Sequence, residues 1–425
     1  MGAILKLPRS EIYDVSILEK LKSKWRKEEV YANPGWASDE VTSALLINRL
    51  LYFEDFNEHE AVEGVLNQET SSSFHLIILP HEDCNFRCTY CYETFERGKM
   101  SRGVVDGLKA FSEIDLLSGQ RGITVFNVSW FGGEPCLALD IVDELSSHFT
   151  QLCEKSGINY RSGMTTNGFF LNKATMDRLT KNRVSHFQVT LDGPSRTHDL
   201  SRRRRGGQGT FDVIYNNLKA INKSDIKSTF TIRVNVSPDN YLDVPELIGM
   251  FAKDFQGDER FSLDFHGVGH WGGPHDDGYQ ILDGGTAFDV CLKLTMQACE
   301  AGLAPEPQKR VLCSHGSVCY AGKENSVVVG SDGTLYKCTV AFSDERNKVG
   351  QLKQNGELLI DSSKWQRWVG RTAGQTKCTT CSFMPSCQGK SCPLEALDKD
   401  EPPCPMTELQ LSEMVRFAVA FGGRS

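Results

Sequence analysis

Three cysteines stand close together in the run Cys84-Asn-Phe-Arg-Cys88-Thr-Tyr-Cys91. The run follows an apolar stretch, residues 74–79, that has the composition of a buried strand. Three thiolates from one tight loop can hold three irons of a [4Fe-4S] cube, and the sequence offers no fourth cysteine nearby. One iron would then keep an open position, where it can bind and reduce a ligand. Zinc ligation or inert thiols are the alternatives, although zinc favours two cysteine pairs or a histidine at finger spacing.

Eight further cysteines crowd the last third of the chain, and four are scattered. The crowded eight are Cys313, Cys319, Cys338, Cys378, Cys381, Cys387, Cys392 and Cys404. Because the chain shows no export signal and the cytosol keeps thiols reduced, its 15 cysteines favour metal or redox chemistry over a disulfide framework. A pair of structural zinc sites is the alternative for the crowded eight. The scattered Cys136, Cys153, Cys291 and Cys299 are expected to be small buried hydrophobes.

The composition narrows the class of protein. The chain has 425 residues, 40% hydrophobic and 24% charged, which predicts two or three packed units. A net charge of -8 argues against a nucleic-acid partner, which would call for a cationic surface. No stretch approaches the roughly 20 apolar residues of a membrane span, and residues 1–10 lack the apolar run of a signal peptide. We therefore expect a soluble cytoplasmic protein that binds neither nucleic acid nor membrane.

The elements that must position the cysteine loop alternate between strands and helices. Strands are expected at residues 74–79, 123–130, 160–166, 184–191, 229–236 and 261–266, and helical patterns such as 105–117 and 211–221 fill most gaps between them. This alternation predicts an α/β fold of parallel βα units, and six units predict a partial (β/α)6 barrel.

Several of the expected strands are polar on one face. Arg233 and Asn235 share a face of one strand, and Asp264 and His266 share a face of the next. A polar inner face costs free energy unless something polar is bound there, so the barrel is expected to enclose a cofactor and a substrate. A sheet with one side in water would give the same alternation.

Three parts are expected along the chain: a helical N-terminal segment (1–72), the barrel (73–302) and a Cys-rich C-terminal part (303–425). The C-terminal part has short expected strands at 326–330 and 334–338, and metal is expected to substitute there for an apolar core. The basic run Arg202 to Arg205 is interpreted as a solvated loop.

The cysteine run resembles the hallmark of the radical S-adenosylmethionine (SAM) enzymes, Cys-x3-Cys-x2-Cys with an aromatic residue, here Tyr90, before the third cysteine. The run Gly132-Gly133-Glu134-Pro resembles a second motif of this family, in which glycines permit close backbone approach. The resemblance implies that Tyr90 packs beside the adenine of SAM and that Glu134 faces the SAM ammonium.

Two later strand ends are also similar to this family. The resemblance places the run Thr165-Thr166-Asn167-Gly168 near the SAM ribose, and it makes Thr190 and Arg233 candidates for binding the SAM carboxylate. An arginine suits that role because its fork can bind a carboxylate at two points. An ordinary hydrogen-bonded strand end is the alternative for Thr190.

The C-terminal cysteines resemble the SPASM extension of radical SAM peptide and protein modifiers, although four residues rather than the usual three separate Cys387 from Cys392. The resemblance implies two auxiliary [4Fe-4S] clusters, so three clusters are expected in the chain. It assigns one cluster to Cys313, Cys319, Cys338 and Cys392, and the other to Cys378, Cys381, Cys387 and Cys404.

The resemblance implies an enzyme in which the first cluster reduces SAM and a 5′-deoxyadenosyl radical abstracts a substrate hydrogen. The expected substrate is a ribosomally made precursor peptide that receives a thioether, carbon–carbon or related crosslink. Flavodoxin or ferredoxin is the expected electron donor, and residues 1–72 could bind a leader peptide. A second proton must leave during crosslinking, and Asp264, His266 or His270 is expected to accept it as a catalytic residue.

The sequence leaves two other functions open. The first is conversion of a sulfatase Cys or Ser to formylglycine. The sulfatase-maturing branch typically has an Asp after the cysteine that corresponds to Cys338, where this chain has Thr339, and it begins almost at the first strand. The second is a non-enzymatic electron carrier, which would need neither Glu134 nor a polar lumen.

Overall fold

The structure is a computed structural model that describes residues 72–116, 122–273, 276–305, 316–370, 378, 381, 383–399 and 401–421. The predicted N-terminal segment, apart from Ser72, lies outside the described residues, and so does Cys313. Within the described ranges, no helix is long and apolar enough to cross a membrane.

Six parallel strands form the barrel in the order β1-β3-β4-β5-β7-β8. Their bounds are β1 Ser73–His81, β3 Val125–Gly132, β4 Asn159–Thr166, β5 Val184–Thr190, β7 Thr229–Val236 and β8 Phe261–Gly267. Each expected strand is therefore present, within a few residues of its expected ends.

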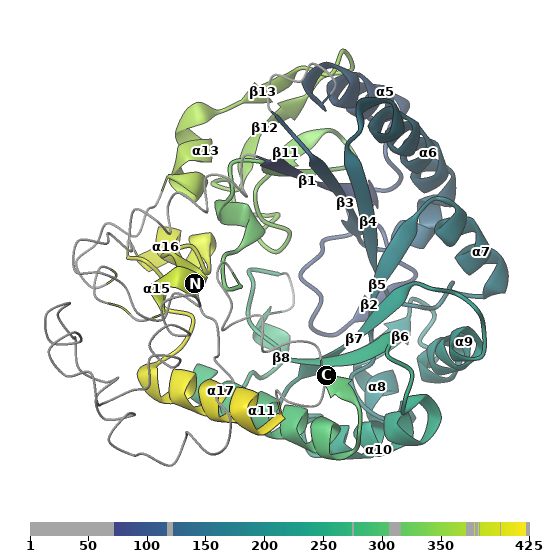
Figure 1. Ribbon diagram of the computed structural model, residues 1–425, viewed down its shortest axis with the longest axis vertical. Helices are drawn as coiled ribbons and strands as arrows, with labels where there is room; N and C mark the ends of the chain where they lie inside the picture. The colour runs from purple at the N-terminus through teal and green to yellow at the C-terminus, as the bar shows by residue number, and fades with distance from the viewer. Residues whose placement is uncertain are drawn as a thin grey trace, which may run out of the picture.

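A helix follows each barrel strand and covers the outer side of the curved sheet (Figure 1). These helices are α5 Arg102–Phe111, α6 Leu139–Ser156, α7 Lys173–Lys181, α9 Phe211–Asn222, α10 Val244–Phe255 and α11 Gly284–Glu300. They form because apolar residues recur at helical spacing, as in α5, where Val104, Leu108 and Phe111 are buried against the sheet. The predicted partial (β/α)6 barrel is confirmed.

Short elements complete the barrel. They are β2 Phe86–Cys88, α8 Ser195–Ser201, β6 Arg202–Arg204 and β9 Ala304–Pro305, the single turns Pro135–Ala138, Asp276–Gly278 and Tyr320–Gly322, and a π-helical turn at Ser112–Leu116. β9 pairs in parallel with β8 at the barrel's edge.

The C-terminal part continues the barrel sheet. Its strands are β10 Ser326–Val329, β11 Thr334–Tyr336, β12 Lys348–Leu352 and β13 Leu358–Ile360. β10 runs parallel to β1, with Val328 opposite Ile77, and β11 to β13 follow as antiparallel strands. The eleven strands thus form one sheet that crosses the expected boundary at residue 302.

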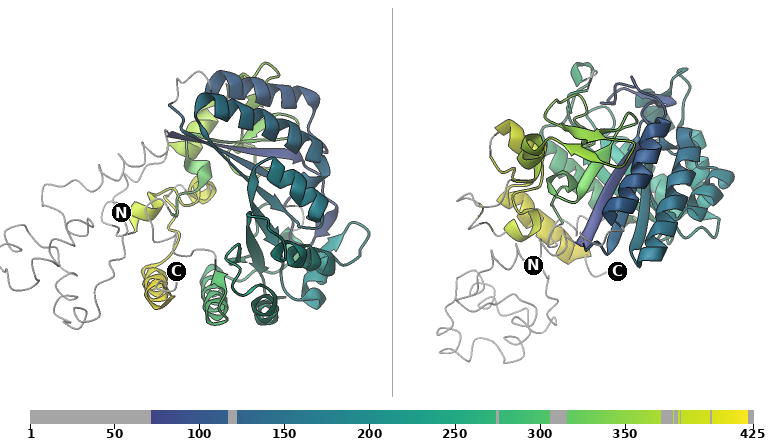
Figure 2. Two further views of the ribbon diagram at one scale, coloured as in Figure 1. Left: turned by 45° about the vertical axis from the view of Figure 1, so that its right-hand side comes forward. Right: turned by 90° about the horizontal axis from the view of Figure 1, so that it is seen from above.

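Four short or medium helices accompany these strands: α13 Ser362–Val369, α15 Met384–Cys387, α16 Pro393–Lys399 and α17 Glu408–Phe421. Figure 2 shows α17 beside α11. Val327, Leu335 and Trp368 pack into the same hydrophobic core as the barrel. The strands of the C-terminal part and α13 therefore share the hydrophobic core of the barrel sheet. The expected contribution of metal to the stability of this part stays a prediction.

The scattered cysteines behave as expected. Cys136, Cys153 and Cys291 are buried in the barrel core, and Cys299 packs half-buried beside α17 residues.

Candidate functional site

The cysteine loop leaves the carboxyl end of β1 and is held by a short two-stranded sheet. β2 pairs antiparallel with β6, so Cys88 lies opposite Arg202. Asp83 accepts a hydrogen bond from the backbone N–H of Cys84 (2.8 Å), and Arg87 donates to the Cys84 carbonyl (2.7 Å). These contacts hold the backbone of the cysteine loop in place.

The Gly-Gly turn after β3 lies directly against this loop. The N–H of Gly133 donates to the His81 carbonyl (3.1 Å), and the N–H of Glu134 donates to the Asp83 carbonyl (3.2 Å). A Cβ atom at position 133 would lie 2.5 Å from the Asp83 carbonyl oxygen, and Gly132 has a φ of +110°. Glycine is required at both positions, as the motif predicted.

Glu134 lies behind the cavity wall with no solvent exposure. One carboxylate oxygen accepts from the Cys136 N–H (2.9 Å) and the Thr166 hydroxyl (2.8 Å), and the other accepts from the Asn167 N–H (2.8 Å). Burial raises the pKa of Glu134, and these hydrogen bonds oppose that shift. Its described contacts therefore join the Gly-Gly turn to the end of β4.

One cavity of about 540 Å³ opens at the carboxyl ends of the barrel strands. The three loop cysteines line it, together with the predicted residues Tyr90, Gly132, Gly133, Thr166, Asn167, Thr190, Arg233 and His266. The polar strand faces thus surround an internal cavity, as predicted, and its volume suits a ligand of cofactor size.

Tyr90 belongs to a buried polar network on the far side of this cavity. Its hydroxyl donates to the Asp192 carboxylate and accepts from Arg202 (2.8 Å) and Asn235 (3.1 Å). These hydrogen bonds hold the Tyr90 side chain at the cavity, which it lines.

Thr190 and Arg233 lie opposite each other on β5 and β7. Arg233 donates to the Asn235 side chain (3.1 Å) and lies 3.6 Å from the Asp264 carboxylate. Asn235 and Asp264 therefore hold the Arg233 guanidinium in position, and Arg233 lines the cavity.

The three residues predicted to accept a proton are separated by the fold. His266 lines the cavity, Asp264 pairs with Arg233, and His270 lies on the exposed segment after β8, with its Nε2 3.2 Å from the Tyr279 carbonyl. The Arg233 charge, followed by desolvation inside the cavity, lowers the pKa of His266 to about 3, although part of the residue is exposed to solvent. His266 is accordingly neutral at physiological pH, with a pKa below the near-neutral range that the sequence argument anticipated.

The donors around the loop cysteines suit an iron–sulfur cluster. The Phe86 N–H donates to the Cys84 sulfur (3.3 Å), and the Asn167 amide lies 3.6 Å from the same atom. Burial raises the pKa of Cys88, and the Arg202 cation opposes that shift. In the described ranges, no three His, Cys, Asp or Glu side chains lie close enough together to hold a single metal ion. A four-iron cube takes one thiolate per iron and so needs its ligands farther apart.

The C-terminal cysteines gather in two groups. Burial and then the thiols of Cys338 and Cys392 raise the pKa of Cys319 to about 12. Burial also raises the pKa of Cys387, with further contributions from Cys381, Cys378 and Cys404. The two ligand sets and their clusters stay a prediction, and Cys313 lies outside the described residues.

Two cavity residues were missed in the sequence. Arg202 is 7% exposed, so the solvated-loop interpretation is wrong for this residue; its pairing opposite Cys88 and its bond to Tyr90 bury it. Glu93 lines the cavity, and its Oε1 has no hydrogen-bond partner among the described residues. Burial raises the pKa of Glu93 to about 8. Its position just after the third loop cysteine was the one available signal.

Comparison with known proteins finds similarity over the barrel and beyond it. Residues 78–251 match the radical SAM superfamily. The chain is 22% identical to the serine-type anaerobic sulfatase-maturating enzyme of Klebsiella pneumoniae, over 75% of this chain and 82% of that one. It is 23% identical to the cysteine-type enzyme of Clostridium novyi, over 74% and 87%. An uncharacterized protein of Synechocystis is 28% identical, but the match spans only 44% of its length and 42% of this chain.

Solved structures share the fold. Native anSMEcpe with bound AdoMet and Cp18Cys peptide superimposes with a TM-score of 0.60 at 18% identity, covering 82% of this chain and 97% of that one. Streptococcus suis SuiB bound to its precursor peptide SuiA gives 0.54 at 15% identity, covering 88% of each chain.

Proposed function

Because residues 78–251 form a radical SAM domain, we propose that this enzyme modifies a ribosomally synthesised precursor peptide. The observation that carries the proposal is the single cavity shared by the cysteine loop, the Gly-Gly turn and the strand ends with Thr190 and Arg233. A reduced [4Fe-4S] cluster and SAM, when bound there, would supply a 5′-deoxyadenosyl radical that abstracts a substrate hydrogen.

The residues around the cavity have distinct proposed roles. The loop cysteines Cys84, Cys88 and Cys91 would hold three irons. Arg233, beside Thr190, would bind the SAM carboxylate, and the fixed Tyr90 ring would pack against the adenine. The walls of the barrel would exclude water from the reacting atoms.

A peptide substrate is supported by the fold shared with SuiB and anSMEcpe, whose structures contain peptides. We infer that the product is a thioether, carbon–carbon or related crosslink. Formylglycine formation is the second candidate, because two relatives are sulfatase-maturing enzymes. Against it, Thr339 lines the cavity where that branch has its Asp, and its hydroxyl pairs with Tyr320 (2.7 Å). A threonine in that bond offers no carboxylate base.

His266 is the residue we propose to accept the substrate proton, because among the three predicted residues it alone lines this cavity. Its acceptor capacity would rise when a SAM carboxylate neutralises the Arg233 charge, since that charge is the first cause of its low pKa.

The C-terminal part, residues 303–425, would hold the two auxiliary clusters, which take up the electron released by the substrate radical. Flavodoxin or ferredoxin would return an electron to the first cluster, and residues 1–72 would bind the leader of the precursor. We infer from these assignments that the enzyme is cytoplasmic.

The test combines the reconstituted enzyme, dithionite and SAM with a precursor peptide encoded beside its gene, or with a sulfatase peptide. We expect 5′-deoxyadenosine and a precursor that has lost two hydrogens without hydrolysis of its backbone. The variant with all three loop cysteines replaced by Ala is the inactive control. If formylglycine forms in the sulfatase peptide and the precursor is unchanged, the crosslinking function is wrong and formylglycine formation is the better assignment.

A further inference from the structure

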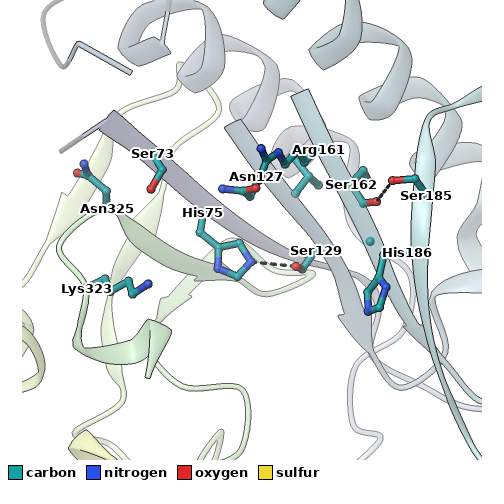
Figure 3. A pocket seen from close by; sticks show the side chains of 12 residues that line it. Ser73, His75, Asn127, Ser129, Arg161, Ser162, Ser185, His186, Lys323 and Asn325 are labelled. Carbon is teal, nitrogen blue, oxygen red and sulfur yellow. Dashed lines mark hydrogen bonds between the residues drawn. The ribbon is translucent and has the colours of Figure 1, made fainter. Parts of the chain in front are cut away.

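A second cavity, of about 390 Å³, lies at the opposite end of the barrel lumen. Side chains from the amino-terminal halves of β1, β3, β4 and β5 line it, together with the segment that leads into β10. Figure 3 shows His75 and Lys323 on one side of this space and Arg161 and His186 on strands farther along the sheet. None of the described residues with a proposed cofactor or cluster role lines it.

The lining of this amino-end cavity is cationic. Its described lining residues include Arg161 and Lys323 and no Asp or Glu. Within the described part of the chain, neither cation forms an ion pair. Four serines and the amides of Asn127 and Asn325 also line the cavity, although the Ser185 hydroxyl donates to the Ser162 carbonyl (3.4 Å). Cations and neutral donors without a carboxylate are the groups that bind an anion.

The pKa of His75 reflects the electrostatic potential in this cavity. Its Nε2 lies 2.8 Å from the Ser129 hydroxyl. Burial, then the Lys323 and Lys337 charges, lower its pKa to about 4. The ring is therefore neutral, and the Lys323 and Lys337 charges contribute a positive potential beside it.

The two cavities meet. His75 and Ser129 line both of them, so the lumen runs from the cluster loop to the amino ends of the strands. Position 163 on β4 is a glycine, and a Cβ there would lie 3.3 Å from the His186 carbonyl oxygen at the cavity's edge.

The length of β3 gives the distance between the two ends of the lumen. From Asn127 to Gly132, β3 rises about 17 Å at roughly 3.3 Å per residue. An extended peptide with the same rise would span this distance with four or five residues.

We propose that the amino-end cavity is an anion subsite that binds a carboxylate side chain of the substrate peptide, four or five residues from the residue that is modified. The proposal rests on the proposed function for the presence of a peptide. It adds the chemistry that the substrate must carry and the spacing at which it must carry it.

The test measures binding without turnover. Two blocked peptides, acetyl-Ala-Ser-Ala-Ala-Ala-Glu-Ala-amide and its Gln counterpart, are titrated into the folded protein containing isotope-labelled histidine. The His75 ring resonance is assigned as the one absent from His75→Gln. We expect the Glu peptide to shift this resonance, to raise the pKa of His75 and to bind about tenfold more tightly than the Gln peptide.

Two double variants test whether the preference for the Glu peptide arises in the amino-end cavity. Arg161→Gln combined with Lys323→Gln should abolish the preference for Glu. Lys155→Gln combined with Lys181→Gln removes the same charge from exposed helix positions and should leave the preference intact. Circular dichroism of both double variants checks that they are folded.

Equal affinity for the two peptides, no binding of either, or a preference that survives in the Arg161/Lys323 variant would each overturn the proposal. Free glutarate that binds as tightly as the Glu peptide would overturn its peptide part and assign the cavity to a small dicarboxylate. The proposed function fails separately, if the Glu peptide binds here but no precursor or peptide is ever modified.

Discussion

Glu134→Gln distinguishes a residue that holds the cavity wall from one that binds SAM directly. In the structure, all three described hydrogen bonds to the Glu134 carboxylate come from the chain itself. A glutamine can keep its oxygen toward the Cys136 N–H and the Thr166 hydroxyl. Its NH2 group then faces the Asn167 N–H, so that two donors oppose each other.

The expected loss of stability follows from these contacts. A buried N–H left without an acceptor costs about 1–3 kcal/mol, and the two remaining bonds lose their charge assistance. Relief of the buried charge offsets part of this loss, since burial is the first cause of the raised pKa of Glu134. We expect the free energy of unfolding of the apo-protein to fall by about 2–3 kcal/mol.

The assay is urea unfolding of the apo-protein, followed by tryptophan fluorescence, beside the SAM dissociation constant of the reconstituted enzyme. Trp130 is fully buried on the neighbouring strand and reports this region. Glu144→Gln is the matched control, because Glu144 forms surface ion pairs with Arg102 and Lys109, and such pairs contribute little.

For Glu134→Gln we expect the SAM dissociation constant to rise less than about tenfold. If stability is unchanged and SAM binding weakens by about 10- to 150-fold, the loss expected for a direct charge-assisted bond of about 1.5–3 kcal/mol, our reasoning is wrong and Glu134 contacts SAM.

Three further predictions concern the cavity. Replacing the three loop cysteines together by Ala should remove about four of some 12 irons and abolish 5′-deoxyadenosine formation; continued SAM cleavage would refute the cluster assignment. Arg233→Gln should raise the pKa of His266 from about 3 toward its ordinary value of 6.5, because the cation that disfavours the imidazolium is gone, and NMR titration with an unchanged pKa would contradict this. His266→Asn should abolish crosslinking while SAM cleavage persists, whereas Asp264→Asn should impair SAM binding and His270→Asn should have little effect; full modification by His266→Asn, measured by mass spectrometry, would exclude it as the base.

The sequence alone was sufficient wherever the information is local. Cysteine spacing gave the candidate cluster loop, alternation gave the six strands and their polar faces, and Gly132 and Gly133 marked a close backbone approach. Each of these depends on residues adjacent in the chain, whose spacing and period are fixed by backbone geometry.

Only the tertiary structure decided which distant residues meet. The pairing of β6 with β2 buries Arg202, although its sequence context is that of a basic loop. The parallel pairing of β10 with β1 gives the C-terminal part its core and brings Lys323 to the amino-end cavity. The end of β4 supplies the hydrogen-bond donors that occupy Glu134. Strand pairing across up to 250 residues depends on the packing of the whole sheet, which no local period encodes.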